Sequence, residues 1–356
     1  MNRNIRIKFM GRISTAQNPH YWLALFPNGT PVIDGCEFIF DPDERDYDWF
    51  AVYEDLMYPE GSTKSERSET LSCFKENTLL VTQEPSSIKI YGPKFLAQYG
   101  HVLSAQPKKI VAHKNHILEV APIRWFYGRP LSYEDQDYTT VDELCAITIP
   151  DKNQCLSTVC SDKQMTKSLK ARFEFTKFIK ESLDDTFTWY GRGVMPLNDK
   201  ADAMNSFKYH IAVENDVFPH YWTEKIADSF LAYCLPFYHG PKNITEYFSP
   251  KSFIPIDIYD PRGSLEIIKA AISENVYEDY LPHIKKARDK VLTDYNIMNT
   301  VARLVKARNA GQTASGDEGG TIYGRHAFRK KHPLAATYDA LHRLKYEALF
   351  KKHTEL

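Results

Sequence analysis

Paired cysteines and long apolar runs are both missing from this sequence. The six cysteines are scattered, with no C-x-x-C pair, and no histidines stand at zinc-ligand spacing. We therefore expect reduced thiols and no metal site. No window approaches 18 consecutive apolar residues, which argues against a membrane-spanning helix. A strand-like run at 5–10 begins close to Met1 and leaves no room for a signal peptide, so we expect a cytoplasmic protein.

Charge of one sign is also lacking. The formal net charge is −1, and no basic stripe with interleaved aromatics is present, so we expect no nucleic-acid partner and only local anion sites. Apolar residues make up 43% of the chain and charged residues 26%, as in a globular protein with a sizeable core. A length of 356 residues suits two domains and a tail.

Short apolar runs alternate with helical patterns along most of the chain, which predicts an α/β fold with parallel sheets. The expected strands are 5–10, 36–40, 49–53, 78–82 and 101–104, and then 156–160, 186–190, 209–213, 235–238 and 253–256. Helices are expected at 94–99, 169–183 and 223–232, with helical periodicity again over 264–310. We expect one domain at 1–150 and a second at 151–308.

The remaining residues, 309–356, read as a flexible linker and an amphipathic helix. The linker is polar and rich in glycine over 309–320. One face of the predicted helix carries Leu334, Tyr338, Leu341, Leu344 and Ala348. This face suits docking onto the main body or onto a second subunit, and the alternative is a peripheral membrane contact.

The most informative stretch runs from the buried strand at 209–213 into a loop and a helix. Thr223 is placed to cap the helix, and Lys225 stands in its first turn. A helix N-terminus with a lysine can receive a pyrophosphate, and Glu224 could accept hydrogen bonds from ribose hydroxyls. The alternative is an ordinary cap with a solvated charge pair.

A longer string of residues around this helix resembles the donor-site block of glycosyltransferase family ten, which contains the bacterial α-1,3/4-fucosyltransferases. The string is Glu214-Asn215, then Tyr221-x-Thr-Glu-Lys225, Pro236, Gly240 and Phe248-x-Pro-Lys-Ser-Phe253. Two earlier segments also resemble the family in order: Val159-Cys-Ser-Asp162 followed by Arg172, and Tyr190-Gly191-Arg192-Gly193. Asp162 departs from the usual asparagine, which leaves the role of that residue open.

The resemblance implies a donor site without a metal or a cofactor. Arg172 and Lys225 would bind the pyrophosphate of the donor, GDP-fucose, and Glu224 would bind its ribose. Asn215, Tyr221, Tyr190 and Gly191 would line the donor pocket, although residues 190–193 could equally be a plain turn. Fixed cations there would stabilise the nucleotide diphosphate as it leaves.

Two segments of the first half complete the resemblance. The strand at 79–82 is followed by Glu84, where the family has a Thr-Gly-Glu element with a proposed general base, and Gln83 replaces the glycine. A structural cap or salt bridge is the competing interpretation of Glu84. Trp125 and Arg129 lie in a segment that resembles the family's Leu-Pro-Trp-x-x-Gly, and they would contact the acceptor or the domain interface.

The resemblance implies a GT-B architecture of two Rossmann-like domains facing across a cleft, the first for the acceptor and the second for the donor, plus the helical C-terminal tail. The implied reaction is inverting transfer of L-fucose from GDP-fucose to a hydroxyl of a glycan acceptor such as lipopolysaccharide. One rival is a glycosyltransferase of the same fold that uses another nucleotide sugar. The other is a catalytically silent glycan-binding protein.

Overall fold

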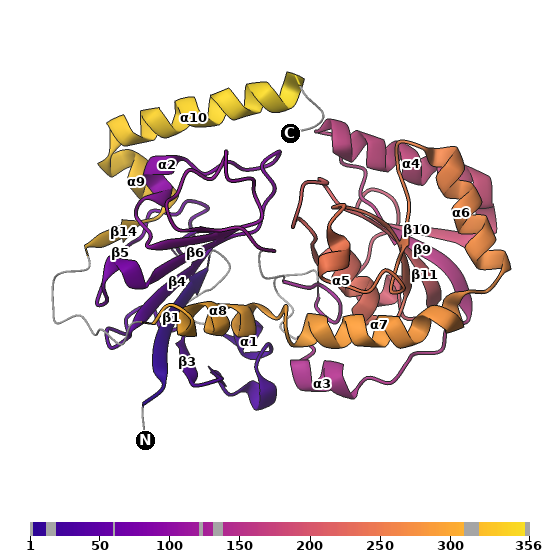
Figure 1. The fold of residues 1–356 in the computed structure, drawn as a ribbon, viewed down its shortest axis with the longest axis horizontal. Helices are drawn as coiled ribbons and strands as arrows, with labels where there is room; N and C mark the ends of the chain where they lie inside the picture. Colours follow the sequence, from indigo (N-terminus) through magenta and orange to yellow (C-terminus); the bar gives the residue numbers. More distant parts are fainter. Residues whose placement is uncertain are drawn as a thin grey trace. The chain divides into compact units, whose positions relative to one another are not determined.

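The computed structural model describes residues 3–11, 19–59, 61–120, 124–130, 138–309 and 320–352. The chain divides into two compact units (Figure 1). Unit 1 comprises Met1–Pro122 together with Ile297–Leu356, and unit 2 comprises Ile123–Asn296. Each unit has its own α/β sheet.

The sheet of unit 1 has the strand order β2-β3-β1-β4-β6-β7-β8. The strands are β1 (Ile5–Gly11), β2 (Val32–Ile33), β3 (Cys36–Ile39), β4 (Trp49–Tyr53), β6 (Thr78–Thr82), β7 (His101–Ser104) and β8 (His116–Ile117). All pairings are parallel except that of β2 with β3. Every residue of β4 and β6 is buried, as expected for a parallel sheet covered on both faces. The strands predicted in this half are therefore confirmed.

Residues from the end of the chain complete unit 1. Strand β14 (Thr321–Tyr323) pairs antiparallel with β5 (Ser68–Thr70), and Ile322 and Phe328 are buried in the same apolar cluster as Phe50 and Val52. The helices of this unit are α1 (His20–Leu23), α2 (Pro93–Leu96), α8 (Ile297–Lys306), α9 (Arg325–Lys331) and α10 (Pro333–Lys352). The C-terminal segment is thus part of the core of unit 1.

Helix α10 packs against α2 through a carboxylate. Both oxygens of Asp339 accept hydrogen bonds, from the backbone N–H of Lys94 at 2.8 Å and of Phe95 at 2.9 Å. A Cβ atom on Gly92 would lie 2.0 Å from Cγ of Asp339, so only glycine fits there. The predicted helix is present, but it contacts unit 1 with the side that carries Asp339, and the predicted apolar face is exposed: Leu334 by 87%, Leu341 by 63% and Leu344 by 54%.

The sheet of unit 2 is fully parallel, with the strand order β10-β9-β11-β12-β13. Its strands are β9 (Gln154–Val159), β10 (Phe187–Tyr190), β11 (Phe207–Val213), β12 (Leu235–His239) and β13 (Ile254–Pro255). Its helices are α3 (Val141–Ala146), α4 (Lys167–Leu183), α5 (Glu224–Leu231), α6 (Pro261–Ser273) and α7 (Tyr277–Leu292). The two Rossmann-like α/β units expected for a GT-B fold are present.

The units have other boundaries than the predicted domains at 1–150, 151–308 and 309–356. Helix α3 lies in unit 2, whereas α8 and the tail lie in unit 1. The reason for α8 is visible in its contacts: the Cys36 thiol donates to the carbonyl of Ala302, and Lys306 pairs with Asp34. Of the predicted linker at 309–320, residues 310–319 lie outside the described part of the chain.

All six cysteines are free thiols. Among the helices that the structure describes, none combines the length and the apolar character needed to cross a bilayer.

The contact of α10 with α2 gives a stability prediction. Asp339→Ala leaves the first N–H groups of α2 without their acceptor, and loss of a helix cap costs about 1 kcal/mol. We expect the free energy of unfolding to fall by about that amount in urea titrations, and protease to cut α10 faster. Lys345→Ala, an exposed change on the same helix, is the control. Equal unfolding midpoints for the two variants would contradict this role of Asp339.

Candidate functional site

The topology of unit 2 creates a binding crevice at one edge of its sheet. The chain passes from β9 through α4 to β10 on one side, and from β11 through α5 to β12 on the other. Right-handed crossovers in opposite directions put α4 and α5 on opposite faces. The carboxyl ends of β9 and β11 therefore form a topological switch point, where ligands bind in open parallel sheets.

Three cationic side chains line a small pocket at this switch point. Arg172 comes from α4, Lys225 from α5, and Lys200 from a short 3-10 helix (Lys200–Ala203). The ends of the two strands, Val159 and Val213, line the same pocket. The sequence predicted Arg172 and Lys225 but not Lys200, which lies in a segment without strand or helix periodicity.

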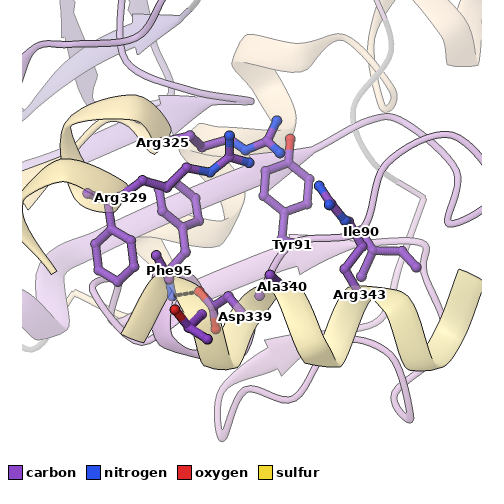
Figure 2. Close-up of a pocket in the computed structure, with 12 residues that line it drawn as sticks. Ile90, Tyr91, Phe95, Arg325, Arg329, Asp339, Ala340 and Arg343 are labelled. Atoms are coloured by element: carbon purple, nitrogen blue, oxygen red, sulfur yellow. Dashed lines mark hydrogen bonds between the residues drawn. The ribbon is translucent and has the colours of Figure 1, made fainter. Parts of the chain in front are cut away.

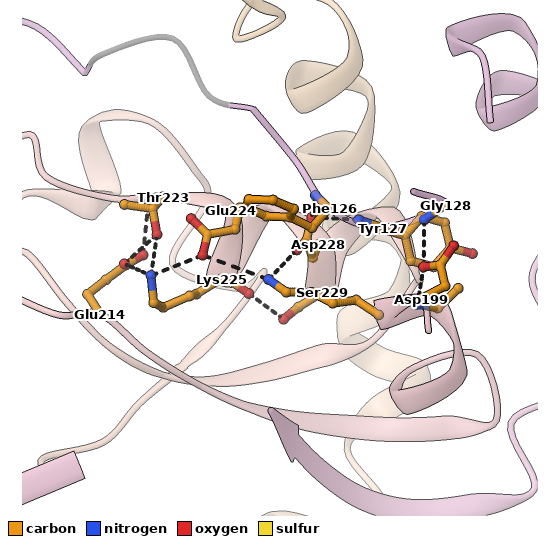
Figure 3. A network of polar contacts seen from close by, with 12 residues as sticks. Phe126, Tyr127, Gly128, Asp199, Glu214, Thr223, Glu224, Lys225, Asp228 and Ser229 are labelled. Carbon is orange, nitrogen blue, oxygen red and sulfur yellow. Dashed lines mark hydrogen bonds and ion pairs between the residues drawn. The ribbon is translucent and has the colours of Figure 1, made fainter. Parts of the chain in front are cut away.

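Lys225 is held by a buried carboxylate at the end of β11. Its ammonium group lies 3.4 Å from Glu214, and it donates to Oγ1 of Thr223 at 2.9 Å and to Glu224 at 3.2 Å. Glu214 is 2% exposed and also accepts from the hydroxyl of Tyr238 at 3.1 Å. Figure 3 shows Lys225 between the two carboxylates. Glu214 is part of the sequence motif, but the motif alone indicates no role for it.

The start of α5 differs in one detail from the expectation. Thr223 occupies the N-cap position, as predicted, but its side chain makes no capping hydrogen bond. Its backbone N–H and its hydroxyl both donate to Glu214, at 2.8 and 2.6 Å. The hydroxyl oxygen accepts from the ammonium group of Lys225 and not from an N–H of the first turn of the helix. The first N–H groups of α5 therefore remain available to an anion.

A second buried carboxylate continues the network (Figure 3). Asp228 of α5 is fully buried, pairs with Lys200 at 2.7 Å, and accepts from the backbone N–H groups of Phe126 and Tyr127. Lys200 also lies 3.8 Å from Glu224. Asp228 thus positions Lys200 and the segment 124–130 around the start of α5.

The charges of this network determine its protonation. Burial opposes ionisation of Glu224, but Lys225 and Lys200 lower the pKa of its carboxyl to about 2. Burial and the charge of Glu224 raise the pKa of Glu214. Burial also acts against charged Lys225, but the carboxylates of Glu224 and Glu214 raise its pKa overall. Lys225 and Glu224 are therefore both charged near neutral pH.

Arg172 and Asn215, both predicted donor-site residues, are in direct contact. The Arg172 guanidinium donates from Nη1 to the side-chain oxygen of Asn215 at 2.9 Å. Arg172 is 9% exposed, and its Nε is buried without a hydrogen-bond acceptor among the described residues. An oxyanion in the pocket would supply one.

Three further predicted residues lie around the same sheet. Tyr221 is buried against Phe218, with ring centroids 4.9 Å apart. Tyr190 ends β10, and the following Gly191 has φ 147°; a Cβ atom on it would lie 2.3 Å from the carbonyl oxygen of Cys160. Residues 190–193 therefore form a tight turn against the end of β9, and their contact with a nucleotide stays a prediction.

Trp125 and Arg129 are both buried. The Arg129 guanidinium lies 5.6 Å from the centre of the Trp125 ring and equally far from that of Tyr138. Their predicted contact with an acceptor or a domain interface stays a prediction.

Glu84 lies two residues beyond β6, at the carboxyl edge of the sheet of unit 1, as predicted. Gln106 donates from Nε2 to the backbone carbonyls of Glu84 and Lys89, both at 2.8 Å, and so fixes this loop. Two carboxylates that sequence analysis missed follow β4 at the same edge: Glu54, at φ 67°, and Asp55. Positive φ in a residue other than glycine is uncommon and is found at functional sites.

Comparison with known proteins finds a family that resembles the second half of the chain. Residues 149–306 match the family description "Glycosyltransferase family 10 (fucosyltransferase) C-term". This part of the chain is therefore similar to glycosyltransferase family 10, and the resemblance seen in the sequence is confirmed. The matched residues include every predicted donor-site residue, from Arg172 to Lys225, which agrees with the glycosyltransferase class predicted from the sequence.

Individual proteins similar to this chain include a curated relative and several solved structures. The alpha-(1,3)-fucosyltransferase FucT of Helicobacter pylori is 29% identical over 87 residues, which are 24% of this chain and only 18% of the relative. A crystal structure of an alpha1,3-fucosyltransferase with GDP matches 83% of this chain and 93% of its own, at 16% identity and a TM-score of 0.46. The lipopolysaccharide outer core galactosyltransferase WaaB, in its apo form, matches 85% and 99%, at 12% identity and a TM-score of 0.42.

The pKa of Glu224 makes a prediction about acid stability. Its pKa in the folded protein lies below the ordinary value of 4.5, so its stabilising effect is complete above about pH 5 and is lost as the pH falls toward 2. The shift corresponds to at most about 3 kcal/mol. Glu224→Gln should therefore flatten the loss of unfolding free energy between pH 5 and pH 2, whereas Glu181→Gln, an exposed change on α4, should not. The same acid profile for Glu224→Gln and the native chain would contradict the ion pairing.

Proposed function

We propose that the protein transfers L-fucose from GDP-fucose to a hydroxyl of a glycan acceptor, with inversion and without a metal ion. The supporting observation is the cluster of Arg172, Lys200 and Lys225 at the switch point of the unit that resembles family 10. The diphosphate of the donor gains negative charge as the sugar leaves it. Cations fixed in advance at that position stabilise the leaving group.

The donor residues act in distinct ways. Arg172, oriented by Asn215, has a buried Nε that can donate to a phosphate oxygen. Lys225 and the first N–H groups of α5 contribute positive charge beside it. Glu224, kept ionised by two lysines, accepts from ribose hydroxyls. Tyr190, Gly191 and Tyr221, which do not line the small pocket, contact other parts of the donor.

Glu84 is the general base of this proposal, because its carboxylate follows a buried strand of unit 1 and its backbone is fixed by Gln106. It removes the proton from the attacking acceptor hydroxyl. Glu54 is a second candidate for this role, supported by its position at the same sheet edge and its unusual backbone conformation.

The acceptor and the location complete the proposal. We place the enzyme in the cytoplasm, acting on a glycan such as lipopolysaccharide. The exposed apolar face of α10, with Leu334, Leu341 and Leu344, would contact the membrane periphery or a second subunit.

Calorimetric titration with GDP, GDP-fucose, GDP-mannose and UDP-glucose, with chelator and no added metal, tests the donor. We expect selective binding of GDP and GDP-fucose. Because contacts to pyrophosphate and ribose do not read the hexose, tighter binding of another nucleotide sugar would replace the fucosyl proposal by the rival donor. No binding at all would favour a silent glycan-binding protein.

Variants of Lys225 must separate its charge from its structural role. Lys225→Met leaves Glu214 buried without its cation, which should destabilise the fold by about 3–5 kcal/mol. In the double variant Glu214→Gln with Lys225→Met, both replaced side chains are uncharged, and the fold should regain much of that stability. It should still bind GDP about tenfold or more weakly, because a charge-assisted contact to phosphate is lost. GDP affinity equal to that of the native chain would give Lys225 a structural role only.

Glu84→Gln and Glu54→Gln form a matched pair for the general base. Both remove a carboxylate at the same sheet edge and nearly preserve its shape. We expect Glu84→Gln to lower kcat by about 100-fold or more, with the Kd for GDP-fucose unchanged, since a general base contributes at least that factor. GDP release with an acceptor from a glycan screen provides the rate. A large loss for Glu54→Gln alone would move the base to Glu54.

A further inference from the structure

A second polar cavity lies in unit 1, where the tail packs on the sheet. Its volume is about 320 Å³, and it is lined by Ile90, Tyr91, Gly92 and Phe95 together with residues of α9 and α10 (Figure 2). This is the lower end of the usual size of small-molecule sites, enough for one sugar ring with a charged substituent. The donor site of unit 2 contains none of these residues.

Positive charge dominates the lining. Arg325 and Arg329 come from α9 and Arg343 from α10, and Figure 2 shows their guanidinium groups directed toward the hydroxyl end of Tyr91. The one carboxylate of the lining, Asp339, is committed to the backbone of α2.

Among the described residues, direct ion pairing compensates only one of the three arginines, Arg343. In the part of the chain that the structure describes, no carboxylate forms an ion pair with Arg325 or Arg329. Arg343 pairs with Glu347, one turn further along the same helix, at 3.4 Å. Burial and the positive charges of Arg325 and Arg343 lower the pKa of Arg329 overall, although the carboxylates of Asp55 and Asp339 act in the opposite direction. Three like charges converging in a cavity repel one another, and a bound anion would remove that repulsion.

The cavity adjoins the sheet edge that carries the proposed base. Tyr91, over whose ring Arg325 lies at 5.5 Å, donates from its hydroxyl to the backbone carbonyl of Glu54 at 3.2 Å. Gln106 joins the backbone of Glu84 to that of Lys89, two residues before Tyr91. The segment from Glu84 to Tyr91 thus carries both the base and one wall of the cavity.

We propose that this arginine cavity binds an anionic group, a phosphate or a carboxylate, of the glycan acceptor. The acceptor is then a charged saccharide, and a neutral glycan would leave the arginines without a counter-ion. This inference rests on the proposed function, since it assigns the cavity to the acceptor of the same reaction. Guanidinium groups suit both anions because their paired N–H groups match two oxygens.

Binding of glucose 6-phosphate, with glucose and inorganic phosphate as comparisons, tests the cavity directly. Saturation-transfer NMR on the intact protein provides the readout. We expect glucose 6-phosphate to bind and glucose not to bind. Arg325→Gln with Arg329→Gln should weaken binding about tenfold or more. Lys330→Gln with Lys331→Gln, which removes two charges from the same helix, should leave it unchanged.

Three outcomes would overturn the proposal: no binding of glucose 6-phosphate, equal weakening in both double variants, or inorganic phosphate binding as tightly as glucose 6-phosphate. The last would make the cavity a site for a free anion. Because Arg325 lies over Tyr91, Arg329→Gln alone, at an exposed side chain, repeats the test without disturbing that contact. GDP affinity is measured in every variant. If neither the native chain nor any variant binds GDP, the donor proposal is wrong, whereas binding of glucose 6-phosphate tests the arginine cavity independently.

Discussion

The buried carboxylate of Glu214 is the contact on which the rest of the donor site depends. It lies at the end of β11, accepts from Thr223 and Tyr238, and pairs with Lys225. An ionised carboxylate in the interior is costly unless such partners surround it, so its presence fixes the start of α5 relative to β11 and β12. Lys225, which would bind the donor, is therefore also the residue that neutralises the buried carboxylate of Glu214.

Much of the site could be predicted because its signals are local. A buried apolar strand followed by a polar residue marks the carboxyl edge of a parallel sheet, and this pattern located Glu84 and Asn215 correctly at such edges. Arg172 and Asn215 meet although they are far apart in sequence, because α4 and the loop after β11 both border the switch point. Lys200 had no comparable signal, since nothing in its irregular segment indicates which sheet it approaches.

The unit in which each helix packs could not be predicted from such local signals. Helical periodicity over 264–310 predicts an apolar face for α8 but does not say which sheet that face covers, and α8 packs in unit 1. The tail shows the same limit. Leu334 and Leu341 suggested the packing face of α10, whereas the contact is made by Asp339, whose acceptor role needs α2 and Gly92 beside it.

Unit 1 contains strands from the beginning of the chain and buried side chains, Ile322 and Phe328, from near its end. A ribosome makes the chain from the N-terminus, so all of unit 2 emerges before these side chains do. The strands of unit 1 that are synthesised first therefore have an incomplete core until the last part of the chain has been made. A premature stop before β14 would consequently harm the part of the protein that was translated first and spare the part translated after it.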